Sequence, residues 1–153
     1  MADVHSIETR SRNMRAIGSR NTKPELYVRS LLHRSGFRFR IEPDYLPSKV
    51  DIYLPKYRVA VFVHGCFWHG HSDCHLFRLP GTRTEFWREK IASNTVRDER
   101  QSERLLEDGL RVLTVWECAL KGKLRLTEEQ LADALNAFML GTEESSSIRG
   151  SAT

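Results

Sequence analysis

Residues 64–75 hold the side chains with the most chemistry in this chain: four histidines, two cysteines, one acid and two adjacent aromatic residues. Thiolate and imidazole are the ligands that zinc prefers, and a structural zinc site takes four of them in a tetrahedron. Cys66, His71 and Cys74 supply three ligands at short spacing, and the only other cysteine, Cys118, is the natural fourth. We therefore expect a zinc site. The alternative is that the cysteines pack as small apolar residues.

Asp51 is the one acid within an apolar strand pattern at residues 50–54. Such a carboxylate either points to solvent or binds a cation such as Mg²⁺, which takes one or two carboxylates and completes its shell with water and phosphate. The next apolar run, residues 58–63, ends beside the histidines, so a hairpin would bring Asp51 close to His64 and His69. A carboxylate, a metal and a histidine base together suit phosphodiester hydrolysis.

Phe67 and Trp68 lie within the loop that zinc would tighten. Proteins distort a DNA duplex by wedging apolar side chains between base steps, and an exposed aromatic pair suits that role. The alternative is that both residues form a small core over the metal site, because aromatic residues are usually buried.

Charge is distributed unevenly along the 153 residues. Residues 1–50 hold ten basic and five acidic residues, whereas residues 125–153 hold two basic and five acidic ones. A basic arm at a chain end suits phosphate contact, although a solvated basic helix face would look the same. Between residues 9 and 24 there is no acid, and the basic residues are Arg10, Arg12, Arg15, Arg20 and Lys23.

The length fits one domain with a real core. There is no run of eighteen apolar residues and no signal-peptide pattern, and three cysteines fit a disulfide scaffold poorly. We therefore expect a soluble protein of a reducing compartment that does not enter a membrane.

Capping signals and hydrophobic periodicity predict the elements that position these residues. Thr22 and Glu25 mark the start of a helix, and this capping position explains Glu25 without catalysis. Thr84 and Thr127 mark two later helix starts. Helices are expected to about Gly36, over about 85–108 and over 128–141, and strands over 37–41, 50–54, 58–63 and 112–116. This order predicts an α/β fold with a mixed sheet and helices on its faces. We divide the chain into a basic arm (1–20), a catalytic domain (21–141) and a disordered tail (142–153).

Four segments in order resemble signatures of the very-short-patch-repair mismatch endonucleases of bacteria. They are Asn-Met-Arg-Ala-Ile at 13–17, Val-His-Gly-Cys-Phe-Trp-His at 63–69, Thr-Arg-Thr-Glu-Phe-Trp at 82–87 and Val-Trp-Glu-Cys-Ala-Leu at 115–120. The resemblance implies a restriction-endonuclease-like fold. It also implies a monomeric, cytoplasmic enzyme of the bacterial nucleoid that acts on double-stranded DNA. Such an enzyme nicks one strand 5′ to the thymine of a T:G mismatch, which arises from deaminated 5-methylcytosine.

The resemblance also implies roles for individual residues. Asp51 would bind catalytic Mg²⁺ with the backbone carbonyl of Val63. His69 would be the general base, supported by His64 and Glu25. Structural zinc would be bound by Cys66, His71, Cys74 and Cys118. DNA would be contacted by Met14 in the minor groove, by Arg15, by Phe67, Trp68 and Trp87 from the major groove, and by Lys90 and Asn94, both expected to be exposed on the long helix.

The chain departs from the family pattern in several places. Val50 and Val63 stand where proline and threonine are usual, but a backbone carbonyl ligand does not depend on its side chain. One extra residue separates His71 from Cys74, which leaves Asp73 and His75 open as zinc ligands. The second strand lacks the acid and lysine of most related nucleases, so a histidine must act as the base.

A second class of function stays open at this point: a zinc-stabilised DNA-binding module without catalysis. In such a module Asp51 would be a surface acid, and the histidines would tune the metal. The division of the base role between His69 and His64, the flanking sequence preference, the partner methyltransferase and any contact with mismatch-repair proteins also stay open.

Overall fold

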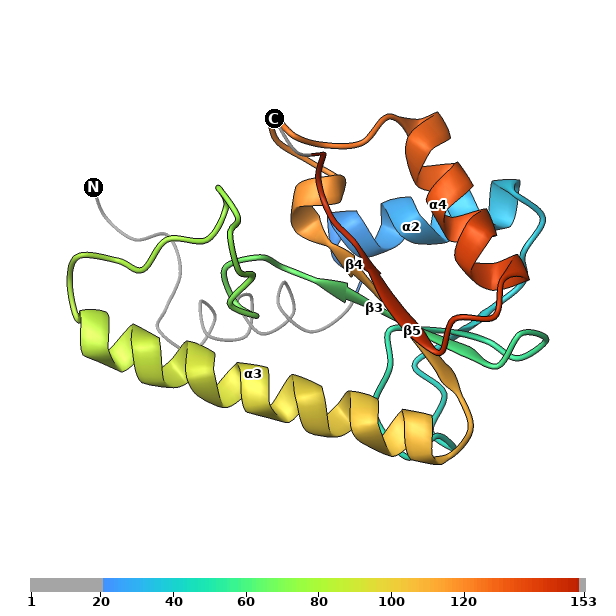
Figure 1. Cartoon of the computed structure of the whole chain (residues 1–153), viewed down its shortest axis with the longest axis horizontal. Coiled ribbons are helices and arrows are strands. Elements are labelled where there is room, and N and C mark those ends of the chain that lie inside the picture. Colours follow the sequence, from blue (N-terminus) through green and yellow to red (C-terminus); the bar gives the residue numbers. More distant parts are fainter. Residues whose placement is uncertain (1–20, 152–153) are drawn as a thin grey trace, which may run out of the picture.

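The computed structural model describes residues 21–151 and shows a mixed sheet of five strands with helices on both faces (Figure 1). This confirms the predicted α/β class. The basic arm predicted for residues 1–20 lies outside the described residues. In chain order the elements are α2 (Lys23–Arg34), β1 (Arg40–Ile41), β2 (Ile52–Leu54), β3 (Val59–His64), α3 (Thr84–Glu107), β4 (Arg111–Trp116), the short 3₁₀ helix η1 (Glu117–Ala119), α4 (Glu128–Leu140) and β5 (Ser145–Ile148).

The strands lie in the order β1-β2-β3-β4-β5. The first three pair antiparallel, and β3, β4 and β5 pair parallel. Parallel neighbours need a crossover, and α3 connects β3 to β4 while α4 connects β4 to β5. His64 pairs with Trp116 at the last position of β3 and β4. The segments that follow these two strands therefore begin at the same edge of the sheet.

Strand β3 is covered on both faces, as its continuous apolar run predicts. Val59 and Val61 pack with residues of α2 and α4, whereas Ala60 and Phe62 belong to the core that includes Leu105 of α3. Figure 1 shows the same layers, with α2 and α4 on one side of the sheet and α3 on the other. Strand β3, which leads directly into the histidine-rich loop, is thus packed between two layers of helices.

The capping signals identify two helix starts correctly. The Thr22 hydroxyl accepts a hydrogen bond from the Glu25 backbone N–H (3.3 Å). Thr127 and Gln130 form a complete capping box. The cap expected at Thr84 is wrong, because α3 is preceded by Arg83 in a left-handed conformation (φ 56°) without a side-chain cap.

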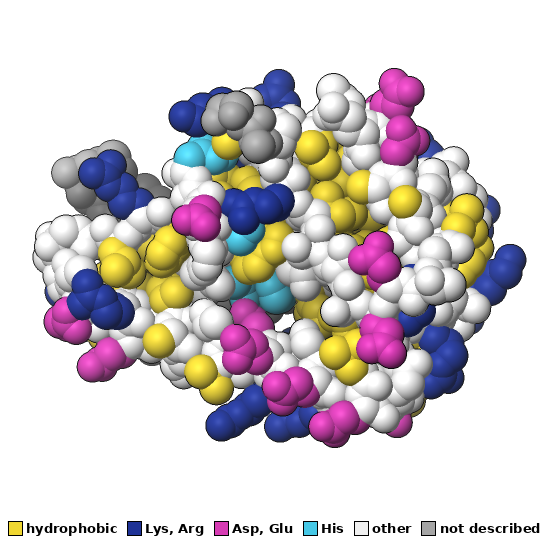
Figure 2. Space-filling model, viewed as in Figure 1, with side chains coloured by type: hydrophobic (Ala, Val, Ile, Leu, Met, Phe, Trp, Pro, Cys, Tyr) yellow, Lys and Arg dark blue, Asp and Glu magenta, His cyan; other side chains and the backbone are white. Residues whose placement is uncertain are grey.

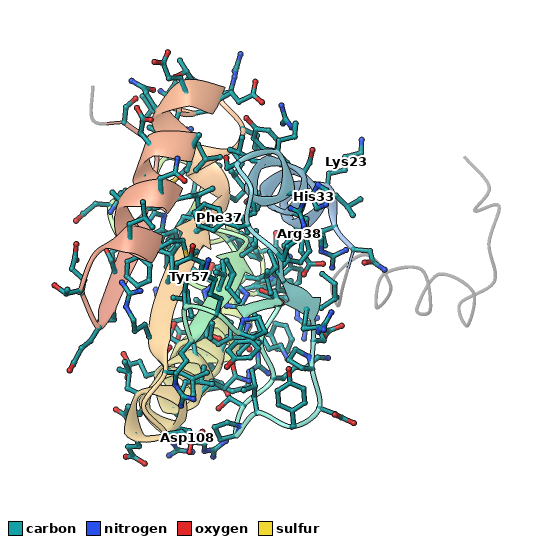
Figure 3. The ribbon with its side chains drawn as sticks, turned by 90° about the vertical axis from the view of Figure 1, so that its right-hand side faces the viewer. Lys23, His33, Phe37, Arg38, Tyr57 and Asp108 are labelled. Carbon is teal, nitrogen blue, oxygen red and sulfur yellow. The ribbon has the colours of Figure 1, made fainter. Side chains whose placement is uncertain are left out.

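The strand expected over residues 37–41 is reduced to the two residues of β1. Phe37 instead closes the end of α2: after Gly36 in the left-handed region (φ 95°), its backbone N–H donates to Leu32 O (3.0 Å). The Phe37 ring then packs edge-on against Tyr57 of the β2–β3 turn, with centroids 5.4 Å apart (Figure 3). Burial of Phe37 against this turn therefore prevails over strand pairing.

The structure also corrects the disordered tail predicted for residues 142–153, because residues 145–148 form β5 beside β4. Backbone pairing does not require apolar side chains: the three serines of β5 are exposed, and Ile148 is buried. Arg111 secures the approach to β5, since its guanidinium donates to Met139 O (3.3 Å) and Glu143 O (2.9 Å). No helix within residues 21–151 is long and apolar enough to cross a membrane.

Candidate active site and metal centre

A cluster of cysteines and a histidine forms where β3 and β4 end. Cys66, His71 and Cys74 lie in the loop after β3, and Cys118 lies in η1 directly after β4. One ligand atom of each residue lies within 4.8 Å of the others. His71 offers Nδ1, which lies 3.4 Å from Cys66 Sγ and 3.6 Å from Cys118 Sγ. The parallel pairing of β3 and β4 thus brings together ligands that are far apart in sequence.

The donor set fits a tetrahedral zinc ion, in which metal–ligand bonds of about 2.0–2.3 Å place neighbouring ligands about 3.6 Å apart. Burial raises the pKa of the Cys66 and Cys118 thiols. Burial and the charge of Arg149 lower the pKa of His71 to about 4. Its imidazole is therefore neutral, the form that binds metal, and a divalent cation would stabilise the buried thiolates. Backbone N–H groups of Cys118 and Gly150 donate to Cys66 Sγ (3.3 Å) and Cys118 Sγ (3.2 Å), as suits thiolate acceptors.

The extra residue between His71 and Cys74 is accommodated in a turn. Asp73 takes a left-handed conformation (φ 51°). Arg149 donates to the carbonyl oxygens of Ser72 (3.0 Å) and Asp73 (2.7 Å). Within residues 21–151, neither Asp73 nor His75 belongs to the group of four clustered ligands. The arrangement therefore favours His71 with the three cysteines.

Two histidines and an aspartate form a second group nearby. The His69 ring stacks on the buried His64 ring, with centroids 3.8 Å apart and planes within 1°. His69 Nδ1 lies 2.6 Å from Oδ2 of Asp98 on α3, a hydrogen-bond distance. Burial and the neighbouring His69 lower the pKa of His64 to about 3, so this ring is neutral near pH 7. Because Nδ1 of His69 is engaged by a carboxylate, Nε2 is the nitrogen left for proton exchange.

Asp98 was not predicted from the sequence. It is one of many charged residues on α3, and its separation from His69 matches no motif. The only available signal is helical spacing, because Asp98 follows Ile91 by seven residues and Asn94 by four, and both of those residues are buried. The ligand atoms of His64, His69 and Asp98 also lie within 4.8 Å of one another, close enough to hold a metal ion.

Asp51 lies in the bend just before β2 rather than inside the strand. Its Oδ2 accepts a hydrogen bond from the Val63 backbone N–H across the β2–β3 hairpin (2.7 Å). Burial raises the pKa of Asp51 to about 7, Val63 opposes this rise, and Glu25 and Glu42 add to it. The charge of His69 lowers the same pKa. A bound cation would favour the ionised carboxylate in this setting.

Glu25 is buried in the first turn of α2. Its Oε2 accepts from the Asn21 backbone N–H (2.7 Å) and forms an ion pair with Arg29 (2.5 Å). In a capping box the Glu25 carboxylate would accept from the backbone N–H of Thr22. Here it accepts from the N–H of Asn21, one residue earlier. Its charge also raises the pKa of Asp51.

The aromatic pair of the loop belongs to a larger cluster at the N-terminal end of α3. The Phe67 ring contacts Trp68, Phe77 and Trp87, with centroids 5.2–6.2 Å apart. Phe86 adjoins Trp87 at 5.3 Å. Trp68 is nevertheless 46% exposed and Phe86 45% exposed, and Figure 2 shows apolar side chains gathered over this end of α3. Phe67 is thus packed within the cluster, as the core interpretation predicts, whereas Trp68 stays accessible.

The loop is closely packed on α3. Asn94, which was expected to be exposed, is buried (6% exposed), and its Nδ2 donates to Trp68 O (2.9 Å). The expectation is wrong because Asn94 satisfies a backbone carbonyl of the loop. Gly70 has a left-handed backbone (φ 59°), and a Cβ there would lie 2.7 Å from the Ile91 side chain. Lys90 is exposed, as expected.

A cavity of about 530 Å³ opens beside the histidines, between α3 and the ends of β4 and β5. His64, His69 and His71 line it together with Asp98 and Arg149. Figure 2 shows histidine side chains at the bottom of this hollow. The predicted DNA contacts Met14 and Arg15 lie outside the described residues.

Comparison with known proteins identifies the family. A family model described as DNA mismatch endonuclease Vsr matches residues 2–76. The chain is 50% identical over 148 residues to the DNA mismatch endonuclease Vsr of Escherichia coli K12, which covers 97% of this chain and 94% of that protein. It is 47% identical over 120 residues to the type II nicking enzyme V.XorIIP of Xanthomonas oryzae pv. oryzae (78% of this chain, 88% of that protein). It is 45% identical over 123 residues to the type II nicking enzyme V.NmeAIP of Neisseria meningitidis serogroup A (80% and 87%). The chain therefore belongs to the Vsr family of DNA mismatch endonucleases.

Proposed function

We propose that this endonuclease nicks one strand of a DNA duplex, 5′ to the thymine of a T:G mismatch left by deamination of 5-methylcytosine. Relatives named as a mismatch endonuclease and as nicking enzymes support this activity. The observation that carries the chemistry is the His69 imidazole, whose Nδ1 lies 2.6 Å from the Asp98 carboxylate. We infer that His69 is an oriented base and that Asp51 is the carboxylate that binds the metal.

Asp51 and the backbone carbonyl of Val63 would hold a Mg²⁺ ion, which when bound stabilises negative charge on the scissile phosphate. In a paired strand, the N–H and C=O of one residue point to the same side. The Val63 N–H points at Asp51, so its carbonyl faces the same side, which supports this ligand pair. An acid just before the first strand of the β2–β3 hairpin, in a mixed sheet covered on both faces, also supports a restriction-endonuclease-like fold.

His69 would accept the proton of the attacking water through Nε2. Asp98 selects the tautomer by binding Nδ1 and stabilises the imidazolium that forms. His64 supports the base by stacking, because a buried, neutral ring holds the plane of His69 without competing for the proton. Glu25 would support the site by adding negative charge that attracts a cation, although the same charge raises the pKa of Asp51.

Structural zinc would tie the loop after β3 to η1 and so hold the aromatic cluster in place. Trp68 is exposed enough to wedge into the duplex from the major-groove side, with Phe67 and Trp87 bracing it. Lys90 would contact bases directly. Asn94 would act through the Trp68 carbonyl that it holds. The remaining proposed contacts are Met14 in the minor groove and Arg15 in the basic arm.

The test uses zinc-loaded protein and duplexes with a T:G mismatch or a matched pair, labelled on either strand. We expect a nick only in the thymine strand, only at T:G and only with Mg²⁺ present. Asp51→Asn should bind the T:G duplex and leave it intact. A wild type that binds T:G with Mg²⁺ but never nicks it would instead identify a zinc-stabilised binding module.

A further inference from the structure

One face of α3 carries a line of cations that the site described above does not use. Arg97, Arg100 and Arg104 follow one another at spacings of three and four residues, so they share a face of the helix. All three side chains are exposed. They line a groove of about 550 Å³ together with Ser93, Val96 and Gln101.

Within residues 21–151, none of these three arginines forms an ion pair. Arg97 donates to the amide oxygen of Asn94 (3.3 Å), a neutral partner. Within residues 21–151, neither Arg100 nor Arg104 forms an ion pair or a side-chain hydrogen bond. Three like charges in one groove repel one another, and a polyanion lying along the groove would remove that repulsion.

The line continues into the aromatic cluster. Lys90 and Phe86 precede Arg97 by seven and eleven residues and therefore share its face, and Phe86 is exposed beside Arg83, whose guanidinium lies 4.3 Å from the ring centroid. From Lys90 to Arg104 the helix rises about 21 Å, at about 1.5 Å per residue. That length matches about six nucleotide steps of one DNA strand, at about 3.4 Å each.

The cationic face of α3 also lies on the flank that contacts the segment before Asp51. The opposite flank of α3 is acidic, and its Glu99 and Glu103 line the other cavity, beside the histidines. On the cationic flank, the Ser48 hydroxyl donates to Gln101 O (2.9 Å), which joins the groove to the segment that leads into Asp51. A duplex following the arginines therefore passes along the flank of α3 that contacts Ser48, three residues before Asp51.

We propose that Arg97, Arg100 and Arg104 form a phosphate-binding track for the duplex that flanks the mismatch. This inference rests on the proposed function for its ligand, double-stranded DNA. Because phosphates are the same in every sequence, the track adds affinity and orients the duplex without reading bases.

The test removes the three charges with Arg97→Gln/Arg100→Gln/Arg104→Gln and measures DNA affinity over a series of salt concentrations. One duplex covers only the mismatch and its immediate neighbours; two others extend it by about ten base pairs, one helical turn, on either side. For the duplex extended over the track, we expect the slope of log affinity against log salt to become shallower by about two to three units, about 0.9 per lost contact. The short duplex should bind as it does to wild type, and matched and T:G duplexes should change equally.

A matched control removes three exposed charges elsewhere, with Lys56→Gln/Lys123→Gln/Arg125→Gln, and should keep the wild-type slope. Zinc content and melting temperature establish that both triple variants are folded. An unchanged slope on every duplex, an equal change in the control, or a loss confined to T:G would overturn the track. Nicking by wild type is scored in the same reactions. Wild type that nicks T:G while the arginine variant keeps its slope refutes only the track. Wild type that shows the slope difference without nicking refutes the proposed function and leaves the track standing.

Discussion

The raised pKa of Asp51 predicts that removing this carboxylate stabilises the protein in the absence of Mg²⁺. In the folded chain the pKa is about 7, against a usual value of 3.8, mainly because the group is buried. The fold thus favours the protonated form. The contribution of Asp51 to stability is complete below about pH 4 and is lost as the pH rises to about 7. Asp51→Asn keeps an oxygen that accepts from the Val63 N–H, but its side chain cannot ionise. The variant therefore avoids the free-energy cost of a buried charge.

The size of the effect follows from the same two pKa values. A difference of one in pKa corresponds to about 1.4 kcal/mol. The gain in free energy of unfolding from Asp51→Asn above pH 7 is therefore at most about 4 kcal/mol. Relaxation around a buried charge lowers such values, and we expect Asp51→Asn to be more stable by about 2–4 kcal/mol at pH 8. The difference should shrink steadily toward pH 5. The same variant should be inactive in nicking.

The assay is urea unfolding of zinc-loaded protein between pH 5 and pH 8, without Mg²⁺ and with it. Asp44→Asn removes an exposed carboxylate from the same segment and should show no such pH dependence. Added Mg²⁺ should stabilise wild type and narrow its gap to Asp51→Asn, because the ion binds the folded state. A gap that does not change with pH, or a variant less stable than wild type at pH 8, would refute the reasoning.

Three further predictions concern the rest of the site. Asp98→Asn should slow single-turnover nicking by about 10- to 100-fold, because it removes a charge-assisted hydrogen bond, whereas Glu99→Gln should change the rate less than twofold. If Asp98 acts through His69, adding Asp98→Asn to His69→Ala should slow nicking no further. An additive loss of rate would contradict this. Cys118→Ala should lower zinc content and melting temperature together, because metal binding contributes to folding, and one zinc per chain with unchanged melting would remove Cys118 from the cluster. Trp68→Ala should keep zinc and stability but bring affinities for T:G and matched duplexes closer, and full discrimination by this variant would leave Trp68 a purely structural role.

The local features of the site were readable from the sequence. The spacing of cysteines and histidines after an apolar strand predicted the cluster, because few donor residues exist and a tetrahedron needs four. Cys118 could be named by elimination, and Asp51 was notable as the one acid in an apolar pattern. The caps at Thr22 and Thr127 were also predictable, since capping depends on residues within one helical turn.

Contacts across the fold could not be read in this way. Asp98 and Asn94 look like solvated polar residues on a charged helix, and only the packing of α3 against the loop turns them inward. Strand β5 carries no apolar signal, because its pairing with β4 uses backbone groups that every residue possesses. Composition alone therefore predicted a disordered tail there.

The sequence by itself determined the family, the donor atoms of the metal cluster and the apolar strands, because these depend on residue types and short spacings. The tertiary structure decided which carboxylate orients His69 and which residue holds the Trp68 carbonyl. It also decided which side of α3 contacts Ser48 and which side lines the cavity beside the histidines. These features depend on the direction in which a helix crosses a sheet and on its rotation about its own axis. Both are set by the packing of the whole core rather than by any local run of residues.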